Sequence, residues 1–540
     1  MSFDPIPYNM LNALGVWSLA MAIILTLTAL TLMVTTLVAS GATGPLLVFE
    51  QVKAGFGDWL GTSWRRVWAV TMLTFRESMR RKTLGVFAVF AILFLFAGWF
   101  LNDVNTDAEL QVRVYVSFVL RAISWLILPV VLLLACWGLP EDIKNRSLHT
   151  VVTKPIRRHE IVLGRILGIS IVGSIVLAGM SVVGYIWIER QLPESMKSKL
   201  VARVPVYGLM SFKDREGNDA ATGVNTGDEW MFRSYVEGNT KARAIWDFQN
   251  IDTSKMADDK LPLESSFQAF RTYKGNLEKG LLCQYTFINE ERKIRAPMRF
   301  LDSKTGKVES AFEVSEFREQ MVHVNRKLLD ENGKEVDLFT DIVQDGKLRV
   351  EARCLTSAQF IGMARPDLFV RLPDRPFAVS FFKGIFGIGL MMVMIVVMGV
   401  MASCFLKGPV ATFLTFFVLL IGRLARPFLV QLTSSDFKAG GVIESIYRII
   451  MHLNPVTDLE QTPAVRIMQG IDRVGLNVMW ALKYLFPDFS HFNMTEYVAK
   501  GFDVPFSAAI LPSLALTVGY TVPWILVGYF SLKLRELEAK

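Results

Sequence analysis

Long apolar runs separated by polar loops make up most of the chain. The seven longest runs occupy residues 14–39, 83–101, 112–139, 161–188, 378–405, 409–432 and 506–532. At roughly 1.5 Å per helical residue, each run predicts a helix of about 30 Å or more, which matches the thickness of a hydrocarbon core. We therefore expect a polytopic α-helical membrane protein with about seven transmembrane helices.

Residues 189–377 follow a different pattern, in which short stretches of alternating polar and apolar residues are separated by turn-forming residues. Half-buried strands are expected over residues 230–236, 266–270, 282–287 and 348–352. Asn332-Gly333 and Asp345-Gly346 predict tight hairpin turns, and Thr305-Gly306 predicts one more weakly. The pattern favours a large β-rich insert with the fold of a β-sandwich.

Two cysteines of this insert lie on predicted inward strand faces. Cys283 alternates with Tyr285 and Phe287, and Cys354 alternates with Val350 and Ala352. Two buried thiols are the simpler interpretation. A disulfide is the alternative, because a compartment outside the cytoplasm would permit it, but its Cα separation cannot be read from a sequence.

Composition agrees with a membrane protein, since 52% of residues are hydrophobic, 20% are charged and the mean hydropathy is +0.36. These values exclude a disordered or low-complexity chain. The formal charge of +8 would suggest nucleic-acid binding in a soluble protein. Here the basic residues gather beside apolar runs, so bilayer orientation explains them and no nucleic-acid partner is expected. The four cysteines form no CxxC or Cys/His cluster, so no metal site or cofactor is expected.

The charge of the short loops predicts the orientation. Residues 40–82 carry seven Lys/Arg against three acids, and residues 138–165 carry six against three. Residues 102–113 reverse this, with three acids against one Arg. Placing the basic loops and the basic tail inside puts the N-terminus outside, the C-terminus inside and residues 189–377 outside the cytoplasm. No Lys or Arg precedes Lys53, so the first run is expected to be a retained helix rather than a signal peptide.

These patterns divide the chain into six segments. We expect an N-terminal transmembrane helix and loop over 1–62, and an interfacial helix, three transmembrane helices and a cytoplasmic segment (about 140–160) over 63–188. The β-rich domain follows over 189–377, two transmembrane helices over 378–432, extracytoplasmic amphipathic or re-entrant helices over 433–505, and the last transmembrane helix and cytoplasmic tail over 506–540. The 433–505 assignment depends on apolar residues at helical spacing in a segment too polar to span a bilayer.

Residues 63–82 predict an amphipathic helix lying flat on the cytoplasmic leaflet. Trp64 and Trp68 recur at helical spacing with Met72, Phe75 and Met79. Arginines occupy the remaining surface, among them Arg76, Arg80 and Arg81. Indole rings at headgroup depth and guanidinium groups near anionic lipid are typical of such helices. The alternative is a basic flank that only orients the next span.

The polar stretch from 139 to 165 predicts a short helix between two spans. Glu141 and Asp142 would start it, where the helix dipole favours acids, and Pro155 would end it. Such a charge-decorated helix is suited to docking in a groove on a soluble partner, although an ordinary basic loop fits too. The candidate docking and positioning residues are Glu141, Asp142, Arg146, Leu148, Pro155, Arg157, Arg158 and Gly164.

At these residues the sequence resembles the permease subunit of ABC transporters of the type-2 exporter class. That family has an interfacial elbow helix, two spans and an acidic-start coupling helix. A motif like residues 154–158 and a Leu-Gly-basic start of the next span, here Leu163-Gly164-Arg165, then follow. The turn at 406–409 and the segment 484–492 also fit. The first span and the large insert depart from the family pattern.

The resemblance implies partners and a location. A separate cytoplasmic ABC-type ATPase would contact the coupling helix, and a second permease copy would complete a homodimer or heterodimer in the inner membrane of a bacterium, with membrane lipid around it. ATP hydrolysis would then drive export or extraction of a substrate that the sequence does not identify.

No catalytic motif is visible in the chain itself. Residues 304–307 lack the upstream glycine and the Ser/Thr of a phosphate-binding loop, so we expect no enzyme activity and assign ATP hydrolysis to the partner. A rival interpretation is a membrane-anchored binding or scaffold protein whose β-rich domain recognises envelope components. A polytopic membrane enzyme is a third interpretation.

Three arginines lie within predicted spans that contain no acidic partner: Arg121, Arg423 and Arg426. A central arginine costs at least roughly 2.5–3.5 kcal/mol on insertion scales, so such residues usually face a cavity or another helix. The alternative is snorkelling toward the outer headgroups. Snorkelling is favoured for Arg426, and both interpretations stay open for Arg423.

The predicted orientation has a direct test. A cysteine introduced at Asn332 should react with a membrane-impermeant maleimide added to intact cells, because the β-rich insert is expected outside. A cysteine introduced at Asn145 should react only after the membrane is permeabilised. The reverse labelling pattern would overturn the orientation.

Overall fold

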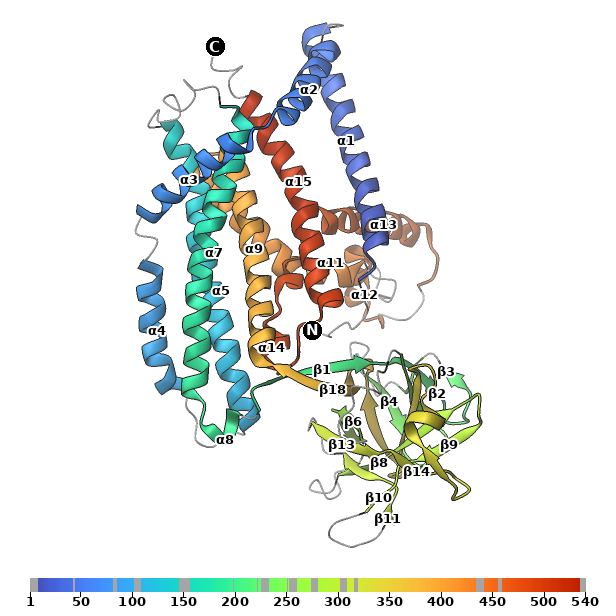
Figure 1. Cartoon of the computed structure of the whole chain (residues 1–540). Coiled ribbons are helices and arrows are strands. Elements are labelled where there is room, and N and C mark those ends of the chain that lie inside the picture. The colour runs from blue at the N-terminus through green and yellow to red at the C-terminus, as the bar shows by residue number, and fades with distance from the viewer. Residues whose placement is uncertain are drawn as a thin grey trace. The chain divides into compact units, whose positions relative to one another are not determined.

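The computed structural model describes residues 8–41, 44–80, 85–101, 108–144, 156–197, 199–220, 222–224, 233–249, 251, 260–272, 280–301, 308–314, 319–433, 441–454 and 459–534. The chain folds into two compact units, shown in Figure 1. We call Leu200–Ser380 with Gly501–Asp503 the β unit. We call Pro7–Lys199, Phe381–Lys500 and Val504–Lys540 the helical unit.

Six helices of the described residues are long and apolar enough to cross a membrane. They are α1 (Met10–Ser40), α5 (Ala108–Lys144), α7 (Arg158–Gln191), α9 (Phe377–Phe405), α10 (Gly408–Leu420) continued by η6 (Ile421–Ala425) and α11 (Arg426–Leu432), and η8 (Phe506–Ile510) continued by α15 (Leu511–Leu534). Six of the seven predicted spans are therefore helices of suitable length, which is compatible with a membrane protein.

The remaining predicted span, 83–101, corresponds to α4 (Gly85–Leu101). Its 17 described residues extend about 26 Å, slightly less than a hydrocarbon core. The count of seven is therefore not confirmed.

The predicted loop at 40–62 is wrong, because α2 (Gly44–Leu60) is a helix. Pro45 stands in its first turn, where a fixed φ angle and a missing N–H cost nothing. Its apolar residues, which sequence inspection assigned to a loop, recur at helical spacing. The next helix, α3 (Trp64–Arg80), confirms the helix expected over 63–82, and a single turn, α8 (Glu194–Lys197), follows α7.

The core of the helical unit surrounds α9, the most buried of the six long helices. Leu132 and Cys136 of α5, five residues of α9 and Ala411 and Val418 of α10 form one apolar cluster with Phe489 and Phe492 of η7 (Phe489–Phe492). Figure 1 shows α5, α7, α9 and α15 running alongside one another. The first helix touches this bundle through Trp17, whose indole N–H donates to the Gly519 carbonyl at 3.0 Å.

The hairpin formed by α12 (Val442–Ile450) and α13 (Pro463–Leu485) has inverted polarity. Three of the four buried residues of its two helices are charged, namely Glu444, Arg448 and Asp472, and the fourth is Val465. Arg448 donates to Glu444 at 2.6 and 3.0 Å, and both side chains are more than nine-tenths buried. Asp472 of α13 accepts the Ile443 and Glu444 amides at 3.0 and 2.7 Å and so caps α12. Both helices were expected from the spacing of apolar residues.

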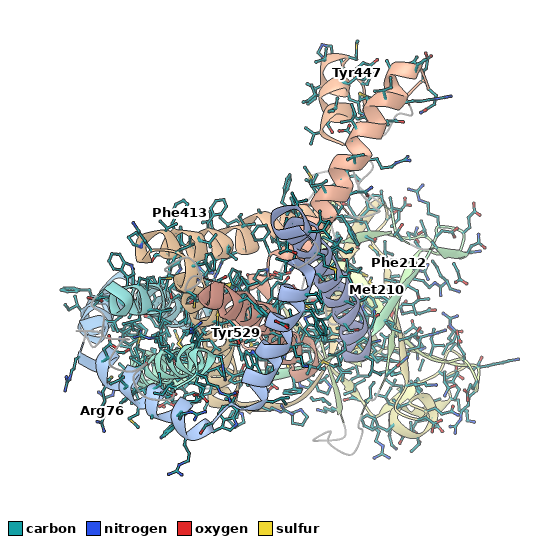
Figure 2. All side chains as sticks on the ribbon, turned by 90° about the horizontal axis from the view of Figure 1, so that it is seen from above. Arg76, Met210, Phe212, Phe413, Tyr447 and Tyr529 are labelled. Atoms are coloured by element: carbon teal, nitrogen blue, oxygen red, sulfur yellow. The ribbon has the colours of Figure 1, made fainter. Side chains whose placement is uncertain are left out.

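Most of the outer surface of this hairpin is apolar, although Arg466 and Arg473 of α13 are exposed as well. The exposed side chains of α12 are Val442, Ile443, Ile446, Ile449 and Ile450, and those of α13 include Ile467, Ile471, Val474, Val478, Trp480 and Leu485. Figure 2 shows the hairpin, marked by Tyr447, projecting from the other helices. A mostly aliphatic surface that also carries exposed arginines suits a membrane interface, and the expected position of the hairpin in the outer interface stays a prediction.

The β unit consists of several antiparallel sheets around one apolar core. Their orders are β1-β18-β6-β13, β12-β8-β16-β5-β2-β3 with β9 beside β8, and β4-β17-β7, with the pairs β10-β11 and β14-β15. The strands are β1 (Val201–Tyr207), β2 (Leu209–Lys213), β3 (Asp219–Ala220), β4 (Ser234–Glu237), β5 (Arg243–Phe248), β6 (Lys260–Ser265), β7 (Gln268–Arg271), β8 (Leu281–Asn289), β9 (Ile294–Pro297), β10 (Phe300–Leu301), β11 (Val308–Glu309), β12 (Phe312–Val314), β13 (Gln320–Asn325), β14 (Lys327–Leu329), β15 (Glu335–Asp337), β16 (Leu348–Cys354), β17 (Gln359–Met363) and β18 (Leu368–Pro376).

The predicted strands at 282–287 and 348–352 are confirmed as parts of β8 and β16, whereas β4 and β7 overlap their predicted ranges only in part. Gly333 turns between β14 and β15 with φ +79°. Asp345 and Gly346 both have positive φ, as a type I′ turn requires, and stand just before β16. The weaker turn at 305–306 lies outside the described residues.

Cys283 and Cys354 lie directly opposite each other on β8 and β16, and both are buried free thiols. The next pair is hydrogen-bonded, since the Leu355 amide donates to the Leu282 carbonyl at 2.8 Å. The cysteines thus occupy a non-hydrogen-bonded position, whose typical Cα separation of about 4.5 Å falls within disulfide range. Burial raises the pKa of Cys354 to about 11 and that of Cys283 well above its usual range. The structure therefore has two buried thiols, the simpler of the two interpretations, at a register that would also permit a disulfide.

The cap on α12 generates a prediction. Asp472→Ala should make the Ile443 and Glu444 amides exchange with solvent about five- to thirtyfold faster, because losing a helix cap costs roughly 1–2 kcal/mol. Hydrogen exchange of the peptide covering 441–454 measures this. Arg473→Ala, an exposed neighbour on α13, is the matched control. Equal exchange in the two variants would show that Asp472 does not hold the hairpin together.

Candidate functional site

The first turn of α7 is joined to the start of α3 by one fully buried carboxylate. Glu160 accepts the Ser63 amide at 2.8 Å and the Arg157 amide at 3.0 Å. Arg66 adds two charge-assisted hydrogen bonds, both at 2.8 Å. This carboxylate therefore caps α7 and fixes the first turn of α3 at once, and we call the contact the α3–α7 junction.

Two glycines then let the helix backbones approach. A Cβ at Gly164 would lie 2.6 Å from the Val70 Cβ, and one at Gly168 would lie 2.9 Å from the Thr71 carbonyl oxygen. The spacing is that of a GxxxG motif, in which small residues allow helices to pack closely. Gly164 was expected to matter, and its physical role is this close contact between α3 and α7.

Neighbouring residues extend the junction to α2 and α5. Arg157 donates to the Gly57 carbonyl at 3.2 Å, and the His159 ring stacks on Trp59 with centroids 5.4 Å apart. Thr62 and His159 share a hydrogen bond of 2.9 Å. Arg165 is buried beside Gly138 of α5, where a Cβ would meet its guanidinium. The start of α7 is thus held by three other helices.

The predicted coupling residues are only partly described. Arg146, Leu148 and Pro155 lie outside the described residues. Helix α5 continues through Lys144, so Glu141 and Asp142 lie in its last turn. The prediction that these acids start a separate helix is therefore wrong. The helix dipole does not stabilise them either, because it favours acidic residues at the N-terminus of a helix and not at its C-terminus. Glu141 is exposed, and Arg158 is the first residue of α7.

The predicted elbow residues lie on the outer face of α3. Trp64 and Trp68 are 71% and 56% exposed, and Arg76 and Arg80 are also exposed. Figure 2 shows Arg76 at the edge of the helical unit. Arg81 lies outside the described residues. The buried face consists of small residues such as Val67 and Thr74, so the tryptophans stay free for contact with a surrounding phase.

Arg426 does not snorkel. It forms an ion pair with Asp488 and donates to the Lys483 carbonyl at 2.9 Å, and its side chain is largely buried. The partner comes from the segment after α13, which a search within the span itself could not reveal. Arg426 is therefore a structural residue that holds α11 against the chain before η7.

Arg121 and Arg423 line one cavity of about 250 Å³ in the helical unit. Its other lining residues are Ser124, Trp125, Ile388, Met391, Phe492, Asn493, Thr495 and Glu496. The walls come from α5, α9, η6 and the segment from η7 to α14 (Thr495–Ala499). Two arginines that are 302 positions apart in the sequence therefore line one site, and the side chains of both are exposed. This shared lining favours the cavity interpretation for Arg423. We call the site the two-arginine cavity.

The backbone around Arg423 is adapted to this site. Residues Ile421–Ala425 form a π-helical turn, which often marks a functional position in a helix. Pro427 explains the turn, because a proline ring clashes with the carbonyl four residues earlier, that of Arg423. Gly422 allows close contact, since a Cβ there would lie 2.3 Å from the Pro487 carbonyl oxygen.

No family model and no curated protein matches this chain. Function is therefore inferred from the residues and their geometry.

Sequence reasoning missed the central residue of the junction. Glu160 stood in a basic stretch and looked like one of several loop charges. An acidic side chain at the third position of a helix is a capping signal, and this signal could have identified it. Ser63 and Asp488 carried no such signal, because their partners lie far away in the sequence.

Replacing Glu160 tests the junction. Glu160→Ala should lower the free energy of unfolding by about 2–3 kcal/mol, since Arg66 and two amides lose their acceptor. Thermal unfolding of the purified protein in detergent measures the change. Glu77→Ala is the matched control, because Glu77 also links α3 to α7 but is one-third exposed and 3.9 Å from Arg165. It should cost below about 1 kcal/mol. Equal losses in the two variants would contradict a special role for Glu160.

Proposed function

We propose that this protein is the membrane-spanning permease subunit of an ABC transporter, which couples ATP hydrolysis by a separate cytoplasmic ATPase to export or extraction of a substrate. The observation that supports it best is the α3–α7 junction. An amphipathic helix with exposed tryptophans is bonded to the first turn of α7, directly after the predicted docking segment.

The junction explains how a push on that segment would spread. A force on the residues before Arg157 acts on the cap of α7, and Glu160 shares its carboxylate with Ser63 and Arg66 of α3. Because the GxxxG contact leaves no space between α3 and α7, the two helices would move as one body. Arg165 beside Gly138 would carry the movement to α5.

The proposal includes an arrangement in the cell. The protein would lie in the inner membrane of a bacterium with seven spans, its N-terminus outside and its C-terminus inside. The β unit would be an extracytoplasmic β-sandwich, and two copies of the chain would pair with two ATPases. The positive-inside rule and the resemblance in the sequence support these statements.

The docking residues provide the test. Glu141→Ala combined with Arg146→Ala should reduce co-purification of the ATPase about tenfold or more, because truncating partly desolvated charges at an interface costs about 2–5 kcal/mol. The matched control removes the exposed pair Glu194 and Lys197 of α8, which are expected on the other side of the membrane. Membrane insertion should be normal in both variants.

A double variant that keeps its full ATPase complement and activity would contradict coupling through this segment. The rival function, a membrane-anchored scaffold whose β unit recognises envelope components, would then account better for the chain.

A further inference from the structure

The two-arginine cavity contains more positive charge than its walls neutralise. Arg121 and Arg423 contribute two cations, and Glu496 contributes one carboxylate. Among the described residues, neither arginine forms an ion pair with Glu496 or any other acid. The contrast with Arg426 is clear, because Arg426 has Asp488 as its partner.

Both arginines lie at the same expected depth. Arg121 is about a third of the way along Leu110–Glu141 from its expected outer end, and Arg423 is about a third of the way along Gly408–Leu432 from its expected outer end. At that depth, an uncompensated guanidinium is costly, and a bound anion would offset much of the cost. The matched depth allows one anion to contact both groups.

The rest of the lining suits a ligand that has an anionic head group and an apolar tail. Ser124, Asn493 and Thr495 can donate hydrogen bonds to anionic oxygens, and they line the same space as the two guanidinium groups. Ile388, Met391 and Phe492 form an apolar wall, and each is at least nine-tenths buried. Trp125, one turn after Arg121, is 76% exposed, so the cavity is bordered by a surface that would face hydrocarbon.

We propose that the two-arginine cavity binds an amphiphile with a phosphate head group, which enters from the outer lipid monolayer. The guanidinium groups of Arg121 and Arg423 would each donate paired hydrogen bonds to phosphate oxygens, a geometry in which arginine is the preferred residue. The hydrocarbon tail would lie along the apolar wall and Trp125. That this ligand is the transported cargo rests on the proposed function; the binding itself does not.

Binding is measured on the full chain, purified in uncharged detergent without ATP or an ATPase. The probe is radiolabelled oleoyl lysophosphatidic acid. Arg121→Gln and Arg423→Gln should each weaken its binding about ten- to hundredfold, the effect of losing a charge-assisted hydrogen-bonded pair. Arg473→Gln, an exposed arginine of α13 outside the cavity, is the matched control and should bind like the unchanged protein.

Glu496→Gln gives a test of opposite sign. Removing the one carboxylate of the lining should strengthen binding about threefold or more, because a like charge near the phosphate is lost. If the arginines instead served only to neutralise Glu496, this variant would lower the unfolding temperature and leave binding unchanged. Thermal unfolding of all four variants separates the two outcomes.

Competitors identify the source of the phosphate. Unlabelled lysophosphatidic acid should displace the probe, whereas monoolein, which has a similar chain and no charge, should not. Inorganic phosphate at a hundredfold excess should also fail, and displacement by it would overturn the amphiphile in favour of a free anion. Binding that none of the arginine variants weakens would overturn the site itself. Because no ATPase is present, these failures are distinct from a failure of ATPase coupling.

Discussion

The buried carboxylate of Glu160 is the constraint on which the helical unit depends most directly. A carboxylate excluded from water is tolerated only when its oxygens accept several hydrogen bonds, and here four donors satisfy it. Two of these are the backbone amides of Ser63 and Arg157, which lie 94 positions apart in the sequence. The start of α3 and the start of α7 therefore cannot separate without leaving a buried charge unsatisfied. Because the two helices lie so close together, positions 164 and 168 have space only for glycine.

The same requirement distinguishes structural charges from functional ones elsewhere in the helical unit. Arg448 is satisfied by Glu444, and Arg426 is satisfied by Asp488. Both pairs hold a helix in place and need nothing from outside the chain. Arg121 and Arg423 differ, since they share a cavity in which the single carboxylate pairs with neither of them. Arginines that have no acidic partner within the chain and lie in a predicted span are the ones that a bound anion would stabilise. This difference from Arg426 and Arg448 is the reason for proposing a ligand in the two-arginine cavity.

Buried charged groups are also paired in the β unit, which has a core of its own. Asp367 is buried and receives two hydrogen bonds from Arg233, at 2.7 and 2.9 Å, while Glu264 lies between Arg203 and Arg371. Burial raises the pKa of both carboxyl groups, an effect that the nearby guanidinium groups oppose. The first and last strands, β1 and β18, pair with each other, so the chain enters and leaves this unit at neighbouring points. A domain with adjacent ends can be inserted between two helices without forcing them apart.

The sequence by itself determined the helices of the long apolar runs, the alternating strands around Cys283 and Cys354 and the turn at Asp345-Gly346. These features depend on periodicity and backbone preference, which act over a few residues. Only the tertiary structure decided that Arg121 and Arg423 line one cavity, that Asp488 neutralises Arg426 and that the small-residue face of α3, rather than its tryptophans, packs on α7. Such pairings join residues far apart in the chain, and no local pattern encodes which buried charge finds which partner.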